Sequence, residues 1–241
     1  MATYPEKEKY TAEDLEQIIM LLRDPENGCP WDKVQTHASI RKNFLEETYE
    51  ALEAIDADDP AMMREELGDV MMQVIFHCVM EAEKENFTFT DVCDEVCRKL
   101  IYRHPHIFGT LEQQKAGIMD WDVLKNKEKG RRSLADEINT VPKTFPAMMK
   151  AQKMQKRAQP YGCVCGAPDK AAQQAQAAQQ ALAEQLAQGS DEAETRAKAG
   201  EYLFHAVNWV RSAGMDAEEV LSLYNDRFAQ ECAAQNDSEQ A

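Results

Sequence analysis

The feature that most constrains this sequence is a pair of predicted helices that carry acidic residues in their interiors. Apolar residues recur at helical spacing from about His37 to Asp56, and again from Pro60 to about Glu85. Asp59 is a natural N-cap and Pro60 suits the first helical position, so the second helix is expected to begin there. The segment therefore predicts two helices joined by a turn.

Two acidic pairs lie on these helices, and the spacing of each pair puts its members on one face. The pairs are Glu47 with Glu50, and Glu66 with Asp69. Carboxylates on a face that packs are costly unless a cation compensates them. Mg²⁺ would compensate them, because it takes oxygen ligands and keeps several waters. In the first helix the predicted apolar stripe is formed by Phe44, Leu45, Leu52 and Ile55, with Ala51 and Ala54 beside Glu47 and Glu50. In the second helix Glu66 and Asp69 lie in an arc that also holds Met63, Val70, Val74, Phe76 and Met80.

The same acids also fit a solvated helix surface. Asp and Glu supply 43 of the 241 residues, so short acidic patterns arise by chance in such a chain. Runs of charge usually face solvent. Taken alone, the four acids leave both hypotheses open, and the flanking residues have to decide between them.

Those flanking residues resemble the MazG family of nucleoside triphosphate pyrophosphohydrolases. The resemblance is close over roughly residues 10–160 and loose beyond. Several separate blocks agree in order and spacing, which favours the metal site over the solvated surface. The blocks are Gly28-Cys29-Pro30-Trp31-Asp32, Gln35-Thr36-His37, Glu46-Glu47-x-x-Glu50, Glu66-x-x-Asp69, Lys99-x-x-x-Arg103-His104-Pro105-His106-x-Phe108 and Trp121-x-x-x-Lys125.

The resemblance implies a reaction and a set of roles. The reaction is hydrolysis of a nucleoside triphosphate between the α and β phosphates, in a helical protein that forms homodimers. The metal ligands would be Glu47, Glu50, Glu66 and Asp69, holding Mg²⁺, for which Mn²⁺ can substitute. Glu46 would stand outside the ligand set or orient the attacking water as a base, so the catalytic candidates are Glu46, Glu47 and Glu50. The substrate-binding candidates are Lys99, Arg103, Trp31, Trp121 and Lys125.

Several of these residues also have structural interpretations. Trp31 fits a lid on the core as well as a base-stacking residue, and His37 fits a capping role as well as ligand contact. His77, among apolar residues, is expected to be a hydrogen-bonded core histidine. Lys99 and Arg103 are spaced i,i+4 near a helix end, which suits the helix dipole as well as a triphosphate. Gly68 is costly inside a helix, so a helix or phosphate is expected to approach it closely.

Composition excludes some partners. The formal charge of −16 argues against nucleic acid or an anionic membrane as a general partner. The seven cysteines are an odd, scattered set, which suits reduced thiols in a cytoplasm, and a lone Cys163-x-Cys165 pair is a poor zinc candidate. We find no membrane-spanning apolar run and no signal-peptide core, so a soluble cytoplasmic protein is expected.

Every long segment has helical period, so the predicted fold is all-α. A further helix is expected over residues 88–102 with Thr90 as its cap, and others over 11–23, 113–127, 146–158, 171–188, 191–213 and 216–234. The predicted organisation is a catalytic domain at 1–128, a linker at 129–145, and a degenerate repeat at 146–241. Residues 199–204 echo residues 67–72, but Lys198 falls at the place of Glu66.

Three other classes of function are alternatives to this reaction. A di-iron bundle would need a Glu-x-x-His pattern, and no histidine in the sequence has an acid three residues before it. A non-catalytic nucleotide-binding or helical interaction protein remains an alternative, because the second half is already degenerate. A pure interaction protein should gain no thermal stability from Mg²⁺ plus nucleotide, and a non-catalytic binder should gain it without releasing pyrophosphate.

Overall fold

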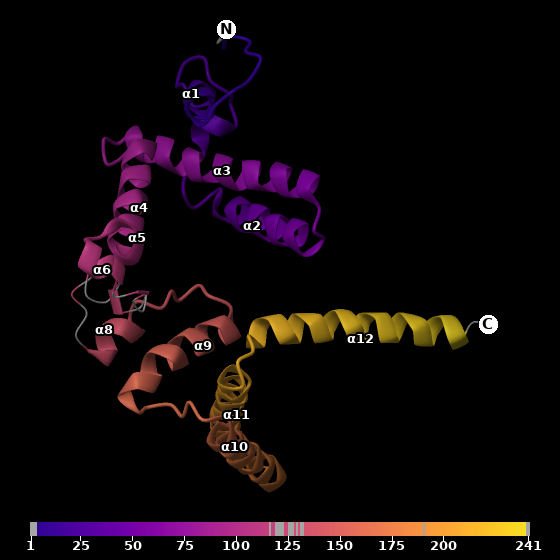
Figure 1. Ribbon diagram of the computed structural model, residues 1–241. Coiled ribbons are helices and arrows are strands. Elements are labelled where there is room, and N and C mark those ends of the chain that lie inside the picture. The colour runs from indigo at the N-terminus through magenta and orange to yellow at the C-terminus, as the bar shows by residue number, and fades with distance from the viewer. Residues whose placement is uncertain are drawn as a thin grey trace. The chain divides into compact units, whose positions relative to one another are not determined.

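The protein is all-α, as the sequence predicts (Figure 1). The computed structural model describes residues 4–115, 117–118, 123–124, 128, 130, 133–189 and 191–239. None of these residues forms a β-strand. Internal contacts divide the chain into two compact units, Met1–Met119 and Asp120–Ala241. The assignment of a catalytic domain, a linker and a degenerate repeat stays a prediction.

The first unit is built on one long helix, α3. Its helices are α1 (Ala12–Leu22), η1 (Asp32–Val34), α2 (Arg41–Asp56), α3 (Pro60–Ala82), α4 (Phe89–Arg103), α5 (Pro105–Phe108) and α6 (Leu111–Lys115). The second unit contains α8 (Leu134–Ile138), α9 (Ala147–Ala158), η2 (Gln159–Tyr161), α10 (Pro168–Gln188), α11 (Glu192–Ser212) and α12 (Ala217–Glu239). The short helix α8 lies inside the predicted linker.

Side-chain caps explain where several helices begin. The Asp59 carboxylate accepts hydrogen bonds from the backbone N–H groups of Ala61 and Met62 at 2.9 and 3.2 Å, so α3 starts at Pro60 as predicted. Helix α4 begins at Phe89, two residues earlier than a cap at Thr90 implies. Thr88 caps α4 in a capping box with Asp91, and the prediction of Thr90 was wrong because Asp91 supplies the reciprocal bond only to Thr88.

The core of the first unit gathers where α1 packs on the C-terminal half of α3. Its buried members are Ile19, Ile40, Ile75, Phe76, Val79 and Met80. The buried Arg23 pairs with both oxygens of Glu83, at 2.6 and 2.8 Å, and donates to the carbonyls of Asp32 and Gln35. This single guanidinium therefore fastens the loop before α2 to the end of α3.

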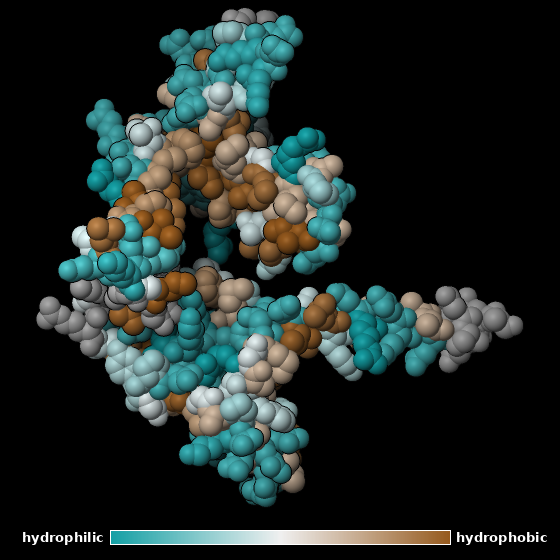
Figure 2. Space-filling view, viewed as in Figure 1, coloured by the Kyte–Doolittle hydropathy of each residue, from teal (hydrophilic) through white to brown (hydrophobic). Residues whose placement is uncertain are grey.

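Helix α2 packs on the N-terminal half of α3 through small residues. Ala51 and Ala54 are buried, and Ala54 has no exposed surface. The predicted apolar stripe of this helix, formed by Phe44, Leu45, Leu52 and Ile55, is exposed instead, which corrects the expectation that it faces a core within the chain. The physical reason is that alanines let two helix backbones approach closely, so they occupy the contact. Figure 2 shows apolar side chains left at the surface of this unit.

The second unit is held by a helical hairpin and by buried amides. Helices α10 and α11 pack together over Ala171, Ala175 and Ala178, which are buried. Two fully buried side chains bond to backbone carbonyls: the Gln155 amide donates to Phe204 at 2.7 Å, and the Asn208 amide donates to Cys165 at 2.9 Å. Amide side chains therefore take structural roles in this unit.

Two findings bear on the environment of the chain. All seven cysteines are free thiols, and all lie within the described residues. Every described helix is too short or too polar to span a bilayer.

Gly68 provides a test of packing. A Cβ atom there would meet nothing within 4 Å, so the expected close neighbour is absent from the described chain. Gly68→Ala should therefore raise the free energy of unfolding by about 1 kcal/mol in thermal melts, because glycine is the poorer helix former.

Gly200→Ala is a matched control, since Gly200 also lies inside a long helix with open space around its Cβ position. A loss of stability in Gly68→Ala alone would contradict the expectation and would show that another chain packs against Gly68.

Candidate metal centre

Three carboxylates converge where α2 and α3 pack. These helices run antiparallel and side by side, joined by a short turn (Figure 1). Glu47 from α2 and Glu66 and Asp69 from α3 each offer one carboxylate oxygen, and these oxygens lie within 4.8 Å of one another. All three side chains are half-buried. Within the described part of the chain, no other group of His, Cys, Asp or Glu forms such a cluster. We call these three residues the carboxylate trio.

The electrostatics of the carboxylate trio are unfavourable without a cation. Burial raises the pKa of Glu47, and the negative charges of Asp69, Glu50 and Glu66 raise it further. Burial also raises the pKa of Glu66, with added repulsion from Glu50, Glu65 and Asp69. Among the described residues no lysine or arginine pairs with the trio. The trio therefore concentrates negative charge that nothing in this part of the chain offsets.

The donor set fits a hard divalent cation. Carboxylate oxygens suit Mg²⁺, Mn²⁺ or Ca²⁺, whereas structural zinc favours thiolates and imidazoles. Gln73 adds to this fit: it lies one turn beyond Asp69, is buried, and its Oε1 atom has no hydrogen-bond partner among the described residues. Helical side chains lean toward the N-terminus, so the Gln73 carboxamide is directed back toward Asp69. Its spacing from Asp69 in an apolar run was the sequence signal, although sequence reasoning gave Gln73 no role.

The other acids of the motif lie at different distances from the trio. Glu50 is exposed, yet its charge raises the pKa of both Glu47 and Glu66, so it borders the trio. Glu46 is also exposed and pairs with Lys42 at 2.7 Å. The structure therefore brings together Glu47, Glu66 and Asp69 with Glu50 at the margin, and leaves Glu46 on the outer surface.

The predicted phosphate ligands lie on another helix. Helix α4 meets α3 near Phe89, at the end of α3 opposite to the carboxylate trio. On α4, Arg103 is buried and Lys99 is half-buried. Two further predicted substrate residues, Trp121 and Lys125, lie outside the described residues.

The structure bears on the structural roles that the sequence suggested for Trp31, His37 and His77. Trp31 is 56% exposed, so the prediction of a lid on the core was wrong and its ring is open to solvent. His77 is hydrogen-bonded, as predicted, because its Nδ1 atom lies 2.7 Å from Nδ1 of His37. His37 does not cap α2. Its Nε2 atom lies 2.5 Å from Glu81, so His37 bridges the loop to α3.

Fold and site together define an all-α protein in which two antiparallel helices hold a carboxylate site for a hard cation. Residues 35–108 match the MazG nucleotide pyrophosphohydrolase domain. The chain is 37% identical over 217 residues to the nucleoside triphosphate pyrophosphohydrolase of Escherichia coli strain K12, covering 88% of this chain and 81% of that protein. It is 35% identical over 218 residues to the nucleoside triphosphate pyrophosphohydrolase/pyrophosphatase MazG of Thermotoga maritima, covering 90% and 82%. The chain belongs to the MazG family.

Glu47 allows the charge of the trio to be tested in the metal-free protein. Because the folded-state pKa of Glu47 lies above its ordinary value of 4.5, its ionised form destabilises the fold at neutral pH. Glu47→Gln should therefore raise the melting temperature at pH 7 in EDTA. The gain should disappear below about pH 4.5, where the wild-type carboxyl is protonated in both the folded and unfolded states.

Glu46→Gln is the matched control, because Glu46 is exposed and already paired with Lys42. Adding Mg²⁺ should stabilise the wild type more than Glu47→Gln. A destabilised Glu47→Gln at pH 7 would contradict the crowding of charge at this site.

Proposed function

We propose that this protein is a divalent-metal-dependent hydrolase that cleaves nucleoside triphosphates to the monophosphate and pyrophosphate. The carboxylate trio is the observation that carries the proposal, since it places three hard ligands on one side of two packed helices. Membership of the MazG family supports the reaction type. We take Mg²⁺ as the ion, with Mn²⁺ as a substitute, because both prefer oxygen ligands.

The roles of the side chains follow from their positions. Glu47, Glu66 and Asp69 would hold the metal, with Glu50 beside them. The ion would polarise phosphate oxygens and make a water more acidic. Glu50 and Glu46 are exposed carboxylates on α2 that could take the proton of the attacking water. Lys99 and Arg103 would neutralise the phosphate chain, and Trp31 offers an exposed ring for the base. Trp121 and Lys125 complete the proposed set.

Apolar side chains at the surface support a homodimer. Leu45, Tyr49 and Leu52 follow one another along the outer face of α2, and each is about half exposed. Helix α4 exposes Leu100 and Ile101 in the same way. Contiguous apolar surface of this kind is typical of an interface rather than of an isolated chain. We propose that a second copy of the chain covers it.

We further propose that the first half, residues 1–128, carries the chemistry, and that the second half does not. The echo of residues 67–72 in residues 199–204 places Lys198 and Glu201 where the first unit has Glu66 and Asp69. These two residues pair with each other at 3.1 Å. A lysine at this position would repel a divalent cation. In the second unit the positive charge of Lys198 therefore takes the place of a metal ion in offsetting the negative charge of Glu201.

Other partners and the location complete the proposal. The net charge of −16 disfavours nucleic acid and anionic membranes as partners. The seven free cysteines support a reducing, cytoplasmic location.

Loss of one metal ligand tests the proposed reaction. Asp69→Asn should reduce Mg²⁺-dependent pyrophosphate release by on the order of 100-fold or more, because it removes one of three charged ligands. The assay follows pyrophosphate and nucleoside monophosphate across a panel of nucleoside triphosphates, with circular dichroism to confirm the fold.

Glu201→Gln is the matched control, since it changes the echoing position of the second unit and should leave turnover unchanged. Full turnover in Asp69→Asn would disprove the site. A wild type stabilised by Mg²⁺ plus nucleotide but releasing no pyrophosphate would favour the alternative of a non-catalytic nucleotide-binding protein.

The dimer is tested at the outer face of α2. Leu52→Glu should convert the dimer to a monomer in light scattering, because it places a charge in an apolar interface. Glu53→Gln, one residue further along and exposed, should leave the dimer intact. A dimer that survives Leu52→Glu would show that α2 is not at the interface.

A further inference from the structure

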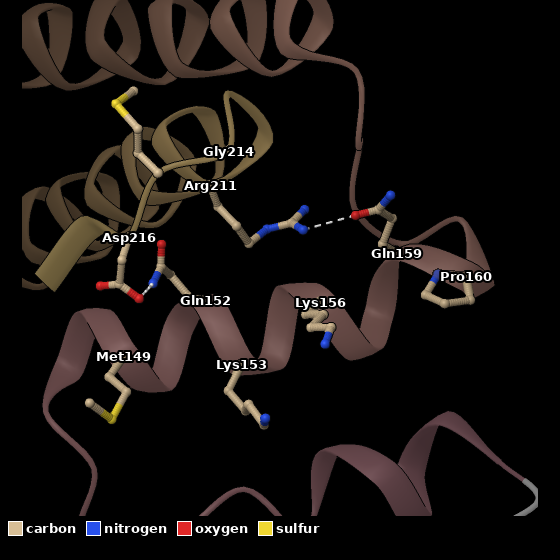
Figure 3. A pocket seen from close by; sticks show the side chains of 10 residues that line it. Met149, Gln152, Lys153, Lys156, Gln159, Pro160, Arg211, Gly214 and Asp216 are labelled. Atoms are coloured by element: carbon tan, nitrogen blue, oxygen red, sulfur yellow. Dashed lines mark hydrogen bonds between the residues drawn. The ribbon is translucent and has the colours of Figure 1, made fainter. Parts of the chain in front are cut away.

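The second unit contains a groove that the proposed reaction does not use. It has a volume of about 750 Å³ and lies between α9 and the segment that joins α11 to α12 (Figure 3). Cationic and apolar side chains share its lining, among them Lys153, Lys156, Arg211, Met149, Pro160 and Met215. Ligand sites commonly have this size and this mixture of apolar wall and a few polar groups.

Arg211 is the central charge of this groove. Amide oxygens hold its guanidinium: Nη1 donates to Gln159 at 2.9 Å, and Nη2 donates to Asn208 at 2.8 Å (Figure 3 shows the bond to Gln159). Asn208 is itself fully buried and fixed to the Cys165 carbonyl. No carboxylate among the described residues pairs with Arg211. Its orientation is therefore set in advance while its charge remains uncompensated.

Arg23 of the first unit shows what a compensated arginine looks like in this chain. It is buried, and Glu83 binds it with both carboxylate oxygens. Arg211 is partly buried as well, and this burial lowers its pKa. The neutral amide oxygens accept hydrogen bonds from the Arg211 guanidinium but do not neutralise its positive charge. A ligand anion could therefore form the charge-assisted hydrogen bonds with Arg211 that Glu83 forms with Arg23.

Two lysines extend the positive charge along α9. Lys153 and Lys156 are three residues apart, and Figure 3 shows both side chains leaving the same side of the helix. Lys153 has no ion pair among the described residues. In a chain with a net charge of −16, a groove lined by Arg211 and Lys153, neither of which has an ion pair among the described residues, is a local exception.

One acid, Asp216, also lines the groove, and hydrogen bonds already occupy it. Its Oδ2 atom accepts from the Gln152 amide at 2.7 Å (Figure 3). Its Oδ1 atom accepts from the backbone N–H groups of Glu218 and Glu219 at 2.9 and 3.2 Å. Asp216 therefore caps the start of α12, where the helix dipole offsets its charge.

We propose that this groove binds a polyphosphate anion, either free pyrophosphate or the phosphate chain of a nucleotide. Arg211 supplies planar paired donors for phosphate oxygens, and Lys153, which lines the same groove, supplies a second positive charge. Met149, Pro160 and Met215 form an apolar wall with room for a nucleoside. The site is separate from the carboxylate trio and needs no metal, so it does not rest on the proposed hydrolysis.

Calorimetry of the full-length chain in EDTA tests the site, because the carboxylate trio then has no metal to recruit phosphate. Titration with ATP and with pyrophosphate should both show binding, and raised salt should weaken it. Arg211→Gln and Lys153→Gln should each raise the dissociation constant by about tenfold, the size of a lost charge-assisted contact. Tighter binding of ATP than of pyrophosphate would identify a nucleotide as the ligand, and equal binding would identify pyrophosphate.

Lys170→Gln is the matched control, since it removes the same charge from an exposed position on α10. Lys153→Gln keeps the test valid if Arg211→Gln disturbs the Asn208 contacts, because Lys153 makes none of the hydrogen bonds that hold the fold. The proposal is overturned if neither anion binds in EDTA, if Lys153→Gln binds like the wild type, or if Lys170→Gln weakens binding equally. Pyrophosphate release in Mg²⁺, measured separately, reports on the carboxylate trio alone.

Discussion

The packing of α2 on α3 through alanine is the contact on which the rest of the first unit depends. Ala51 and Ala54 are small enough for the two helix backbones to approach closely, and this approach brings Glu47 against Glu66 and Asp69. The contact that buries the two alanines therefore also forces three negatively charged carboxylates together, and these repel one another. A divalent cation bound by these carboxylates would offset their mutual repulsion, because its positive charge attracts all three.

The same contact explains why so much apolar surface lies outside. If alanines occupy the inner face of α2, the large side chains of that helix must point away from α3, as Leu45, Tyr49 and Leu52 do. The first unit thus buries a modest core around Ile19, Ile75 and Val79 and leaves a second apolar layer uncovered. Assembly with another copy would complete the burial that one chain begins.

The sequence predicted where the helices lie along the chain better than it predicted which side of each helix is buried. Helical period and the Asp59-Pro60 pair located α2 and α3, and the spacing of the acids located the trio. Periodicity alone could not show that Ala51, rather than Leu52, faces α3, because the alanines 51 and 54 and the residues Leu52 and Ile55 both recur at helical spacing, and the choice depends on how closely the helices approach. Nor could it find the bridge between His37 and His77, which joins residues 40 positions apart. Such contacts depend on tertiary packing, which local sequence does not encode.

Because Lys198 pairs with Glu201, the two units differ in where the counter-ion of their acidic residues comes from. In the second unit the counter-ion of the acid is part of the polypeptide and is present whenever the chain is folded. In the first unit the proposed counter-ion must be drawn from the cell and exchanges with it. Chelators and fluctuations in free Mg²⁺ would therefore act on one half of the molecule only. The stability of the first unit would then follow the ionic state of its compartment, while that of the second unit would stay constant.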